Sequence, residues 1–270
     1  MTLLYGFILA LVVALLAYRV RSLNKSGALA AAVLGTVIFG VGGWQWAILL
    51  LVFFATSSGL SRAFKKRKVG LDEKYAKSGR RDAGQVFGNG GAAGLFALLH
   101  GLFPAALWPW LGFAAALAAV NADTWATELG VLNPHPPRMI TDLSKRVEKG
   151  TSGGVSLVGT AAALAGSGLI AAFAVIYPAQ GWTLNAGHWL LITLSGLAGS
   201  LFDSLLGATV QAIYFCPKDQ KETERHPLHL CGAETVHIRG WKWLTNDWVN
   251  FACGAAGAAL ALAAFLLQAR

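Results

Sequence analysis

Nearly all charged side chains of this sequence are excluded from its long apolar stretches, and this separation constrains the fold more than any other feature. Apolar residues occupy 55% of the 270 positions and charged residues only 13%, whereas a water-soluble domain carries about 25% charged residues. Several stretches approach the ~20 residues that cross a bilayer as a helix. The sequence therefore predicts an all-α, polytopic integral membrane bundle, folded as one domain over residues 1–270.

The apolar stretches predict about eight transmembrane helices. We expect them near residues 2–18, 27–41, 43–60, 89–104, 106–130, 153–177, 187–214 and 247–268. Apart from Arg270, every Lys and Arg lies in one of four connections, near 19–26, 61–88, 131–152 and 215–246. Because positively charged connections remain in the cytoplasm, these four are expected there and both termini outside. The expected location is the cell (inner) membrane, with the active site facing the cytoplasm.

The net charge of +9 is compatible with several partners. Membrane topology alone produces a basic bias of this kind. Anionic membrane lipids or a polyphosphate substrate would add to it. A nucleic-acid partner is not expected, because the sequence contains no recognition module.

Four acidic residues fall inside predicted helices, where a carboxylate at the bilayer centre costs about 3 kcal/mol. They are Asp123, Glu128, Asp203 and Asp247. Most lie toward the cytoplasmic ends of their helices, so we expect them to face protein or water. Hydrogen bonds between membrane helices contribute only about 0.6 kcal/mol on average. A functional polar pocket therefore explains the gathering better than interhelical bonding does.

Helical periodicity gives each carboxylate polar or small neighbours on its own face. Asp123 and Glu128 share a face with Asn121, and Asp247 shares one with Asn250. Asn89 begins the fourth span and Asn246 precedes the eighth. On the seventh span, Asp203 lies among small residues that would let a ligand or a helix approach closely: Gly196, Ser200, Ser204 and Gly207.

The connection before the sixth span has the composition of a phosphate-binding loop. Lys149 is followed by Gly150, Thr151, Ser152, Gly153 and Gly154, and a helix is expected to begin there. A helix N-terminus presents free N–H groups that suit a phosphate, although Gly and Ser also serve as ordinary helix caps. Arg138, Arg80 and Arg81 are basic residues that could neutralise phosphate charge, or could only determine topology.

Two cysteines and two histidines lie in the last large connection. Cys216, His226, His229 and Cys231 could bind zinc, but their spacing lacks a paired CxxC. The sequence leaves open whether these residues bind metal.

Four segments occur in a characteristic order: NADTWATELG at 121–130, KGTSGGVS at 149–156, FDSLLGAT at 202–209 and NDWVN at 246–250. Together they resemble one membrane family, which contains many uncharacterised prokaryotic proteins and the plant phytyl-phosphate kinase of tocopherol synthesis. More distantly, the segment from Asp123 to Gly130 with the glycine loop is similar to dolichol kinase, phytol kinase and phosphatidate cytidylyltransferase, which use CTP and a divalent metal.

The resemblance implies a kinase that transfers a phosphoryl group from a nucleotide, CTP in the first instance, to an isoprenoid monophosphate. Mg²⁺ or Mn²⁺ is the implied cofactor, since Mg²⁺ favours carboxylate and phosphate oxygens. Cytidylyl transfer to a lipid phosphate and small-solute transport are the alternatives. The catalytic candidates are Asp123, Asp203, Asp247 and Lys149.

The remaining candidates fall into three groups. The candidate metal ligands are Asp123, Asp203, Asp247, Glu128, Asn89, Asn121, Asn246 and Asn250. The nucleotide phosphates are assigned to Arg80, Arg81, Arg138 and residues 149–154. The groove for the lipid tail is assigned to Gly196, Ser200, Ser204 and Gly207.

Overall fold

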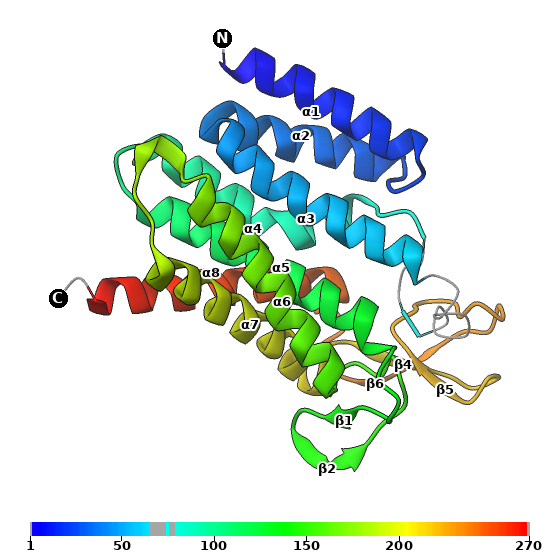
Figure 1. Ribbon diagram of the computed structural model, residues 1–270. Helices are drawn as coiled ribbons and strands as arrows, with labels where there is room; N and C mark the ends of the chain where they lie inside the picture. Colours follow the sequence, from blue (N-terminus) through cyan, green and yellow to red (C-terminus); the bar gives the residue numbers. More distant parts are fainter. Residues whose placement is uncertain (1, 65–73, 76–78, 269–270) are drawn as a thin grey trace.

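The computed structural model describes residues 2–64, 74–75 and 79–268 (Figure 1). Its described residues form eight α-helices that coincide with the eight expected spans. They are α1 (Thr2–Arg19), α2 (Lys25–Gly42), α3 (Trp44–Ala63), α4 (Ala83–Leu102), α5 (Trp108–Gly130), α6 (Leu157–Ile176), α7 (Ala186–Thr209) and α8 (Asn246–Gln268). Residues 65–73 and 76–78 of the expected 61–88 connection lie outside the described residues.

Five of these helices, α2, α3, α6, α7 and α8, are long and apolar enough to cross a membrane. The described part of α1 is apolar but slightly shorter. Helices α4 and α5 carry polar side chains in the halves that adjoin the basic connections, and they are less hydropathic. The count of eight spans and the placement of both termini outside therefore stay predictions.

Helix α5 is the centre of the bundle, which explains its lower hydropathy. It contacts α3, α4, α6, α7 and α8, and it is buried without interruption from Pro109 to Ala122. Half of the residues in this stretch are alanine or glycine, which let neighbouring helices approach closely. Because protein rather than lipid surrounds α5, its polar C-terminal half need not face hydrocarbon. At the edge of the bundle α1 packs on α2 (Figure 1).

Glycines produce the closest approaches between helices. A Cβ added to Gly199 of α7 would lie 2.6 Å from Ala119 Cβ and 2.8 Å from the Cys253 carbonyl oxygen. A Cβ added to Gly88 of α4 would lie 2.6 Å from the Asp247 carbonyl oxygen. These two contacts bring α5, α7 and α8 together and bring α4 against the start of α8. They therefore determine how closely the polar residues of four helices approach one another.

Side-chain caps begin three helices at the end of the bundle that carries the basic connections. Asp82 and Gln85 form a capping box at α4, so this helix begins at Ala83 rather than near residue 89. Asn24 caps α2 by accepting from Gly27 N at 2.8 Å. Ser156 caps α6 by accepting from Gly159 N at 3.1 Å. Each cap satisfies an N–H that the helix itself leaves unpaired.

The expectation of a purely α-helical fold needs one correction, because two connections form small antiparallel sheets. Strands β1 (Arg138–Met139), β2 (Asp142–Arg146) and β3 (Gly154–Val155) pair in the order β2-β1-β3. Strands β4 (Ile213–Cys216), β5 (Lys221–Thr223) and β6 (Val236–Arg239) pair in the order β5-β4-β6. The second sheet explains why α7 ends at Thr209 rather than near residue 214. Both sheets lie at the same end of the bundle (Figure 1).

The close contact at Gly199 generates a stability prediction. Gly199→Ala should lower the stability of the protein by about 1–3 kcal/mol, the usual cost of overpacking a filled interface. Gly59→Ala is the matched control, since a Cβ there meets no atom within 4 Å. Alanine also favours a helix over glycine by up to about 1 kcal/mol. Thermal unfolding in detergent measures both; equal melting temperatures would contradict the proposed close packing.

Candidate functional site

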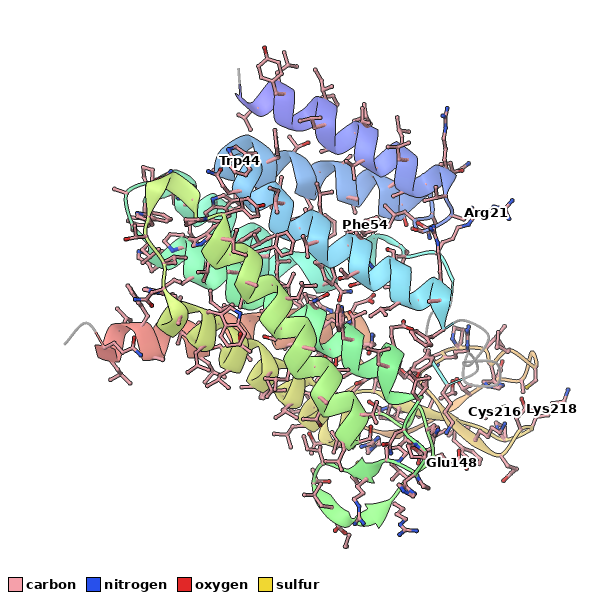
Figure 2. The ribbon with its side chains drawn as sticks, viewed as in Figure 1. Arg21, Trp44, Phe54, Glu148, Cys216 and Lys218 are labelled. Atoms are coloured by element: carbon pink, nitrogen blue, oxygen red, sulfur yellow. The ribbon has the colours of Figure 1, made fainter. Side chains whose placement is uncertain are left out.

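A cavity of 840 Å³ lies at the end of the bundle where the four basic connections meet. Residues of all four connections line it, including Arg21, Arg80, Lys149 and Glu224. The backbone of Arg81 pairs with the α1–α2 connection, at 2.9 Å to Ser22 O and 3.0 Å to Asn24 N. Figure 2 shows Arg21, Glu148 and Lys218 toward this end and Trp44 at the opposite end of the bundle. The four predicted cytoplasmic connections therefore do share one side of the molecule.

Most predicted site residues line this single cavity. The candidate metal ligands that line it are Asp123, Glu128, Asp203, Asp247, Asn89, Asn246 and Asn250. The candidates for phosphate binding that line it are Arg80, Arg81 and residues 149–154, and those for the lipid tail are Ser200 and Ser204. Asn121, Arg138, Gly196 and Gly207 do not line it. The structure thus brings together side chains from α4, α5, α7 and α8 and the glycine loop.

Three of the carboxylates lie close enough to repel one another. Asp203 is subject to the negative charges of Asp123 and of Glu224, and Asp123 to that of Glu224. One oxygen of Asp203, Oδ2, is buried and has no hydrogen-bond partner among the described residues. A buried carboxylate oxygen beside other carboxylates is the donor set that Mg²⁺ and Mn²⁺ prefer. The residues present therefore fit a divalent cation at this position.

Asn121 is a correction to the predicted ligand set. Its Nδ2 donates to Gly166 O at 2.8 Å, and its Oδ1 accepts from Thr56 Oγ1 at 3.2 Å. The side chain is fully buried where α3, α5 and α6 meet. Asn121 thus connects three helices next to the cavity instead of facing into it, and helical periodicity alone could not separate the two positions.

The glycine loop is held against the end of α7. Gly153 has a φ of +85°, and a Cβ there would lie 2.5 Å from Ala208 Cβ. Ser152 Oγ donates to Gln211 Oε1 at 3.0 Å, and Gln211 Nε2 donates to Glu224 Oε1 at 2.8 Å. Because α6 begins only at Leu157, the glycines form a turn and part of β3 rather than the first helical turn that the sequence predicted. The loop nevertheless lines the cavity throughout.

Two basic residues of the loop region are engaged elsewhere. Lys149 Nζ donates to Val131 O at 2.9 Å and to Asn133 O at 2.7 Å, which fixes the chain that follows α5. Its contact with a phosphate stays a prediction. Arg138 is exposed in β1, and its guanidinium donates to Leu143 O of the same hairpin. The structure therefore does not place Arg138 at the cavity.

Lys74, which the sequence did not single out, links three connections. Its Nζ donates to Glu148 Oε2 at 2.6 Å and to Lys149 O at 3.2 Å, and its carbonyl accepts from Glu224 N at 2.8 Å. The hydrogen bond and positive charge of Lys74 lower the pKa of the Glu148 carboxyl. Lys74 is itself 9% exposed, so it acts as a buried clamp between the glycine loop and the segment carrying Glu224.

Arginine side chains line the cavity near α3 and the α1–α2 connection. The Arg81 guanidinium lies 5.9 Å from the ring centroids of both Phe53 and Phe54. Burial lowers the pKa of this guanidinium, and the Glu128 carboxylate acts in the opposite direction. Arg62 Nη2 donates to Val20 O at 2.5 Å and to Ser22 Oγ at 2.8 Å. Arg62 also lines the cavity. The sequence alone could not show this, because an arginine that only determines membrane topology would have the same position in the sequence.

Two of the four residues assigned to the tail groove on α7 do not face open space. A Cβ on Gly196 would lie 2.2 Å from Ser167 Oγ, and one on Gly207 would lie 2.5 Å from Ser152 Oγ. Both glycines therefore pack against protein, and only Ser200 and Ser204 face the cavity. A separate apolar cavity of 190 Å³ lies between α1, α2, α3 and α4. It shares Arg81, Gln85 and Asn89 with the polar cavity.

Comparison with known proteins gives this arrangement a family. Residues 8–258 match the family described as Integral membrane protein DUF92. The chain belongs to this family. It is 33% identical to Protein PGR of Arabidopsis thaliana over 92% of this chain and 91% of that protein. It is 34% identical to an uncharacterized membrane protein of Methanocaldococcus jannaschii over 77% of this chain and 84% of that protein.

A weaker match is 26% identical to Protein VTE6, chloroplastic, of Arabidopsis thaliana, over 86% of this chain and 62% of that protein. No solved structure gives a significant match. The resemblance found in the sequence motifs is therefore confirmed at the level of the family. The chain is an integral membrane protein, and its polar cavity lies among the helices of a membrane bundle.

The mutual repulsion of the carboxylates predicts a metal-dependent stability. At about 100 times its Kd, a divalent cation should stabilise the folded protein by about 2.7 kcal/mol. Asp203→Asn should abolish the increase in melting temperature that Mn²⁺ causes, because it removes a carboxylate that would hold the cation. Glu222→Gln, an exposed change of the same charge, is the control and should preserve the increase. Melting curves with EDTA and with Mn²⁺ measure this; an undiminished Mn²⁺ effect in Asp203→Asn would refute the site.

Proposed function

We propose that this protein is a membrane-embedded kinase that transfers a phosphoryl group from a nucleotide, CTP in the first instance, to an isoprenoid monophosphate such as a phytyl or prenyl phosphate. One observation carries the proposal. Asp123 of α5, Asp203 of α7 and Asp247 of α8 line one cavity with the glycine loop that connects α5 to α6. The motif resemblance to the family that includes the plant phytyl-phosphate kinase supplies the class of substrate.

The chemistry asks for positioning and charge neutralisation. An oxygen of the isoprenoid phosphate attacks the γ-phosphorus of the nucleotide. The bond from that phosphorus to the β,γ-bridging oxygen breaks, and the nucleoside diphosphate leaves with the electron pair. Such a reaction needs little covalent participation from the protein. Bound Mg²⁺ or Mn²⁺ would neutralise charge on the phosphoryl oxygens.

The carboxylates are the residues that would hold this cation. Asp123, Asp203 and Asp247 are the direct candidates, with Asn89, Asn246 and Asn250 nearby on the cavity wall. Glu128 accepts from Ser61 Oγ at 2.7 Å and lies within the electrostatic range of Arg81. We assign Glu128 to positioning Arg81 rather than to the metal, because its partners are a hydroxyl and a guanidinium.

Two groups of cavity residues offer donors to phosphate. Residues 150–154 provide the glycine loop, and Arg62, Arg80 and Arg81 provide guanidinium groups. A guanidinium can bind phosphate oxygens in pairs. One group would bind the nucleotide phosphates and the other the isoprenoid phosphate.

The apolar cavity suits the lipid tail better than the α7 stripe does. It is lined by aliphatic and aromatic side chains of α1, α2 and α3 and reaches the polar cavity at Arg81 and Asn89. An isoprenoid phosphate with its phosphate among the arginines would have its tail directed into this apolar space. We therefore move the tail site to the space between α1, α2, α3 and α4.

The basic connections at the cavity end of the bundle indicate the orientation in the membrane. We propose eight spans, both termini outside, and the cavity facing the cytoplasm of a cell membrane, since positive connections remain in the cytoplasm. Cytosolic nucleotide could then reach a substrate anchored in lipid. The polar residues gather at one end, whereas transporter sites lie near the bilayer midplane, and this argues against small-solute transport.

The central test is turnover of reconstituted protein with labelled nucleotides and a panel of prenyl monophosphates, with and without Mg²⁺. Asp123→Asn should reduce turnover on the order of 1,000-fold, since losing several kcal/mol of charge stabilisation has that effect. Asp142→Asn, exposed in β2, should retain full activity. Product analysis separates a diphosphate product from a cytidylyl product with released pyrophosphate. Full activity of folded Asp123→Asn would remove Asp123 from the metal site.

The tail assignment gives an independent prediction. Ala47→Phe should fill part of the apolar cavity and raise KM for a long-chain substrate about tenfold, because displacing two CH₂ groups costs about 0.8 kcal/mol each. A short-chain monophosphate should be almost unaffected. Ala55→Phe, on the same helix but exposed and outside the cavity, is the matched control. Equal changes in KM for long and short chains would place the tail elsewhere.

A further inference from the structure

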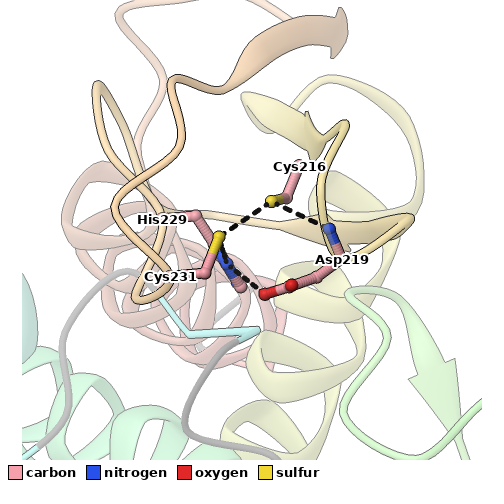
Figure 3. A group of neighbouring side chains, drawn as sticks. All are labelled: Cys216, Asp219, His229 and Cys231. Atoms are coloured by element: carbon pink, nitrogen blue, oxygen red, sulfur yellow. Dashed lines mark hydrogen bonds and ion pairs between the residues drawn. The ribbon is translucent and has the colours of Figure 1, made fainter.

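A second cluster of potential metal ligands lies outside the cavity, in the connection between α7 and α8. Cys216 ends β4, Asp219 lies in the turn that follows, and His229 and Cys231 come from the β5–β6 connection (Figure 3). One ligand atom of each residue lies within 4.8 Å of those of the other three. Residues 15 positions apart are thus brought to one point by the β5-β4-β6 sheet.

Two of the distances within this cluster match the ligand spacing of a tetrahedral metal site, and a third is slightly shorter. Zinc bonds of about 2.0–2.3 Å place neighbouring tetrahedral ligands roughly 3.3–3.8 Å apart. Here Cys216 Sγ and Cys231 Sγ are 3.5 Å apart, and His229 Nδ1 and Cys231 Sγ are 3.4 Å apart. His229 Nδ1 and Asp219 Oδ2 are 3.0 Å apart. Two sulfurs, one ring nitrogen and one carboxylate oxygen, all within 4.8 Å of one another, therefore lie close enough to share one ion.

Neither an ion pair nor a disulfide explains why all four side chains lie together. An ion pair of His229 with Asp219 would leave two thiols beside it unexplained, and a disulfide would leave the imidazole and carboxylate unexplained. The cysteines are free. Cys216 is fully buried and His229 is 4% exposed. The backbone N–H of Asp219 also donates to Cys216 Sγ at 3.4 Å, a contact that orients and stabilises a thiolate ligand.

We propose that Cys216, Asp219, His229 and Cys231 bind one structural Zn²⁺. Two thiolates with a nitrogen and an oxygen ligand form a closed set of four, as in structural rather than catalytic zinc sites. The sequence had suggested His226 for this group. The structure instead stacks the His226 ring on Tyr214, with centroids 4.5 Å apart, and Asp219 takes the fourth position.

The zinc would hold the segment that carries Glu224. This segment runs between the two pairs of ligands, and Glu224 contacts Gln211 at 2.8 Å and lines the polar cavity. Zinc would therefore fix one wall of the cavity without contacting substrate. The inference does not depend on the proposed kinase activity, because metal content is measured without turnover.

The test is zinc analysis of protein purified in detergent without chelator, by mass spectrometry of the metal and by zinc release to a chromogenic chelator. The wild type should carry about one zinc per chain, a closed four-ligand site. Cys216→Ser and Asp219→Asn should each lose most of it, while Cys253→Ser, a buried cysteine of α8 far from the cluster, should retain it. Cobalt substituted for zinc should give thiolate charge-transfer absorption that Cys231→Ser removes.

Stability provides the second measurement. Removing zinc should lower the melting temperature of the wild type and leave that of folded Cys216→Ser unchanged. Three results would each overturn the proposal. They are a wild-type protein without zinc even after incubation with it, a Cys216–Cys231 disulfide in freshly reduced protein, and zinc retained at the wild-type level by Cys216→Ser and Asp219→Asn. An inactive protein that carries one zinc would contradict the kinase and leave this site supported.

Discussion

Electrostatic repulsion among carboxylates inside a membrane bundle is the constraint on which the rest of this structure depends. Asp123, Asp203 and Glu224 each lie within the field of another, and one oxygen of Asp203 is buried without a hydrogen-bond partner among the described residues. Buried negative charges at short range oppose folding unless a cation or protons neutralise them. The surrounding fold holds them together nevertheless, which favours a site that recruits a divalent cation.

The architecture achieves this by enclosing most of one helix, which is buried from Pro109 to Ala122. Helix α5 contacts five other helices, so the face carrying Asp123 meets protein rather than lipid. Gly199 and Gly88 allow α7, α8 and α4 to approach closely enough for their polar residues to meet. Outside the helices, Lys74 and Gln211 tie the glycine loop to Glu224 through direct hydrogen bonds. The site therefore depends on close packing of small residues, because this packing brings the polar side chains together.

The sequence predicted the helices and the carboxylate cluster because both leave local signals. Apolar stretches of bilayer length mark the spans, and a carboxylate in such a stretch is costly enough to require a reason. Asn121 and Gly196 were misplaced because periodicity assigns a residue to a helix face but not to the neighbour that this face meets. Glu224, Lys74 and Asp219 lie in long connections, where only the sheet pairings, invisible in local sequence, determine which side chains meet.

The two proposed metal sites differ in character. The cavity presents oxygen ligands and room for substrate, which suits a labile, hard cation. The cluster on the α7–α8 connection presents two sulfurs in a closed set, which suits a tightly held zinc. The proposed catalytic cation site is thus separate from the proposed structural zinc site, which would fix one wall of the cavity.

The most direct measurement of the central claim is anomalous diffraction from crystals of the protein grown with Mn²⁺. The account predicts a strong anomalous peak in the cavity, bonded to oxygens of Asp123 and Asp203. Manganese absent from the cavity at saturating concentration, with Asp123 and Asp203 instead turned apart or paired with protein cations, would contradict it.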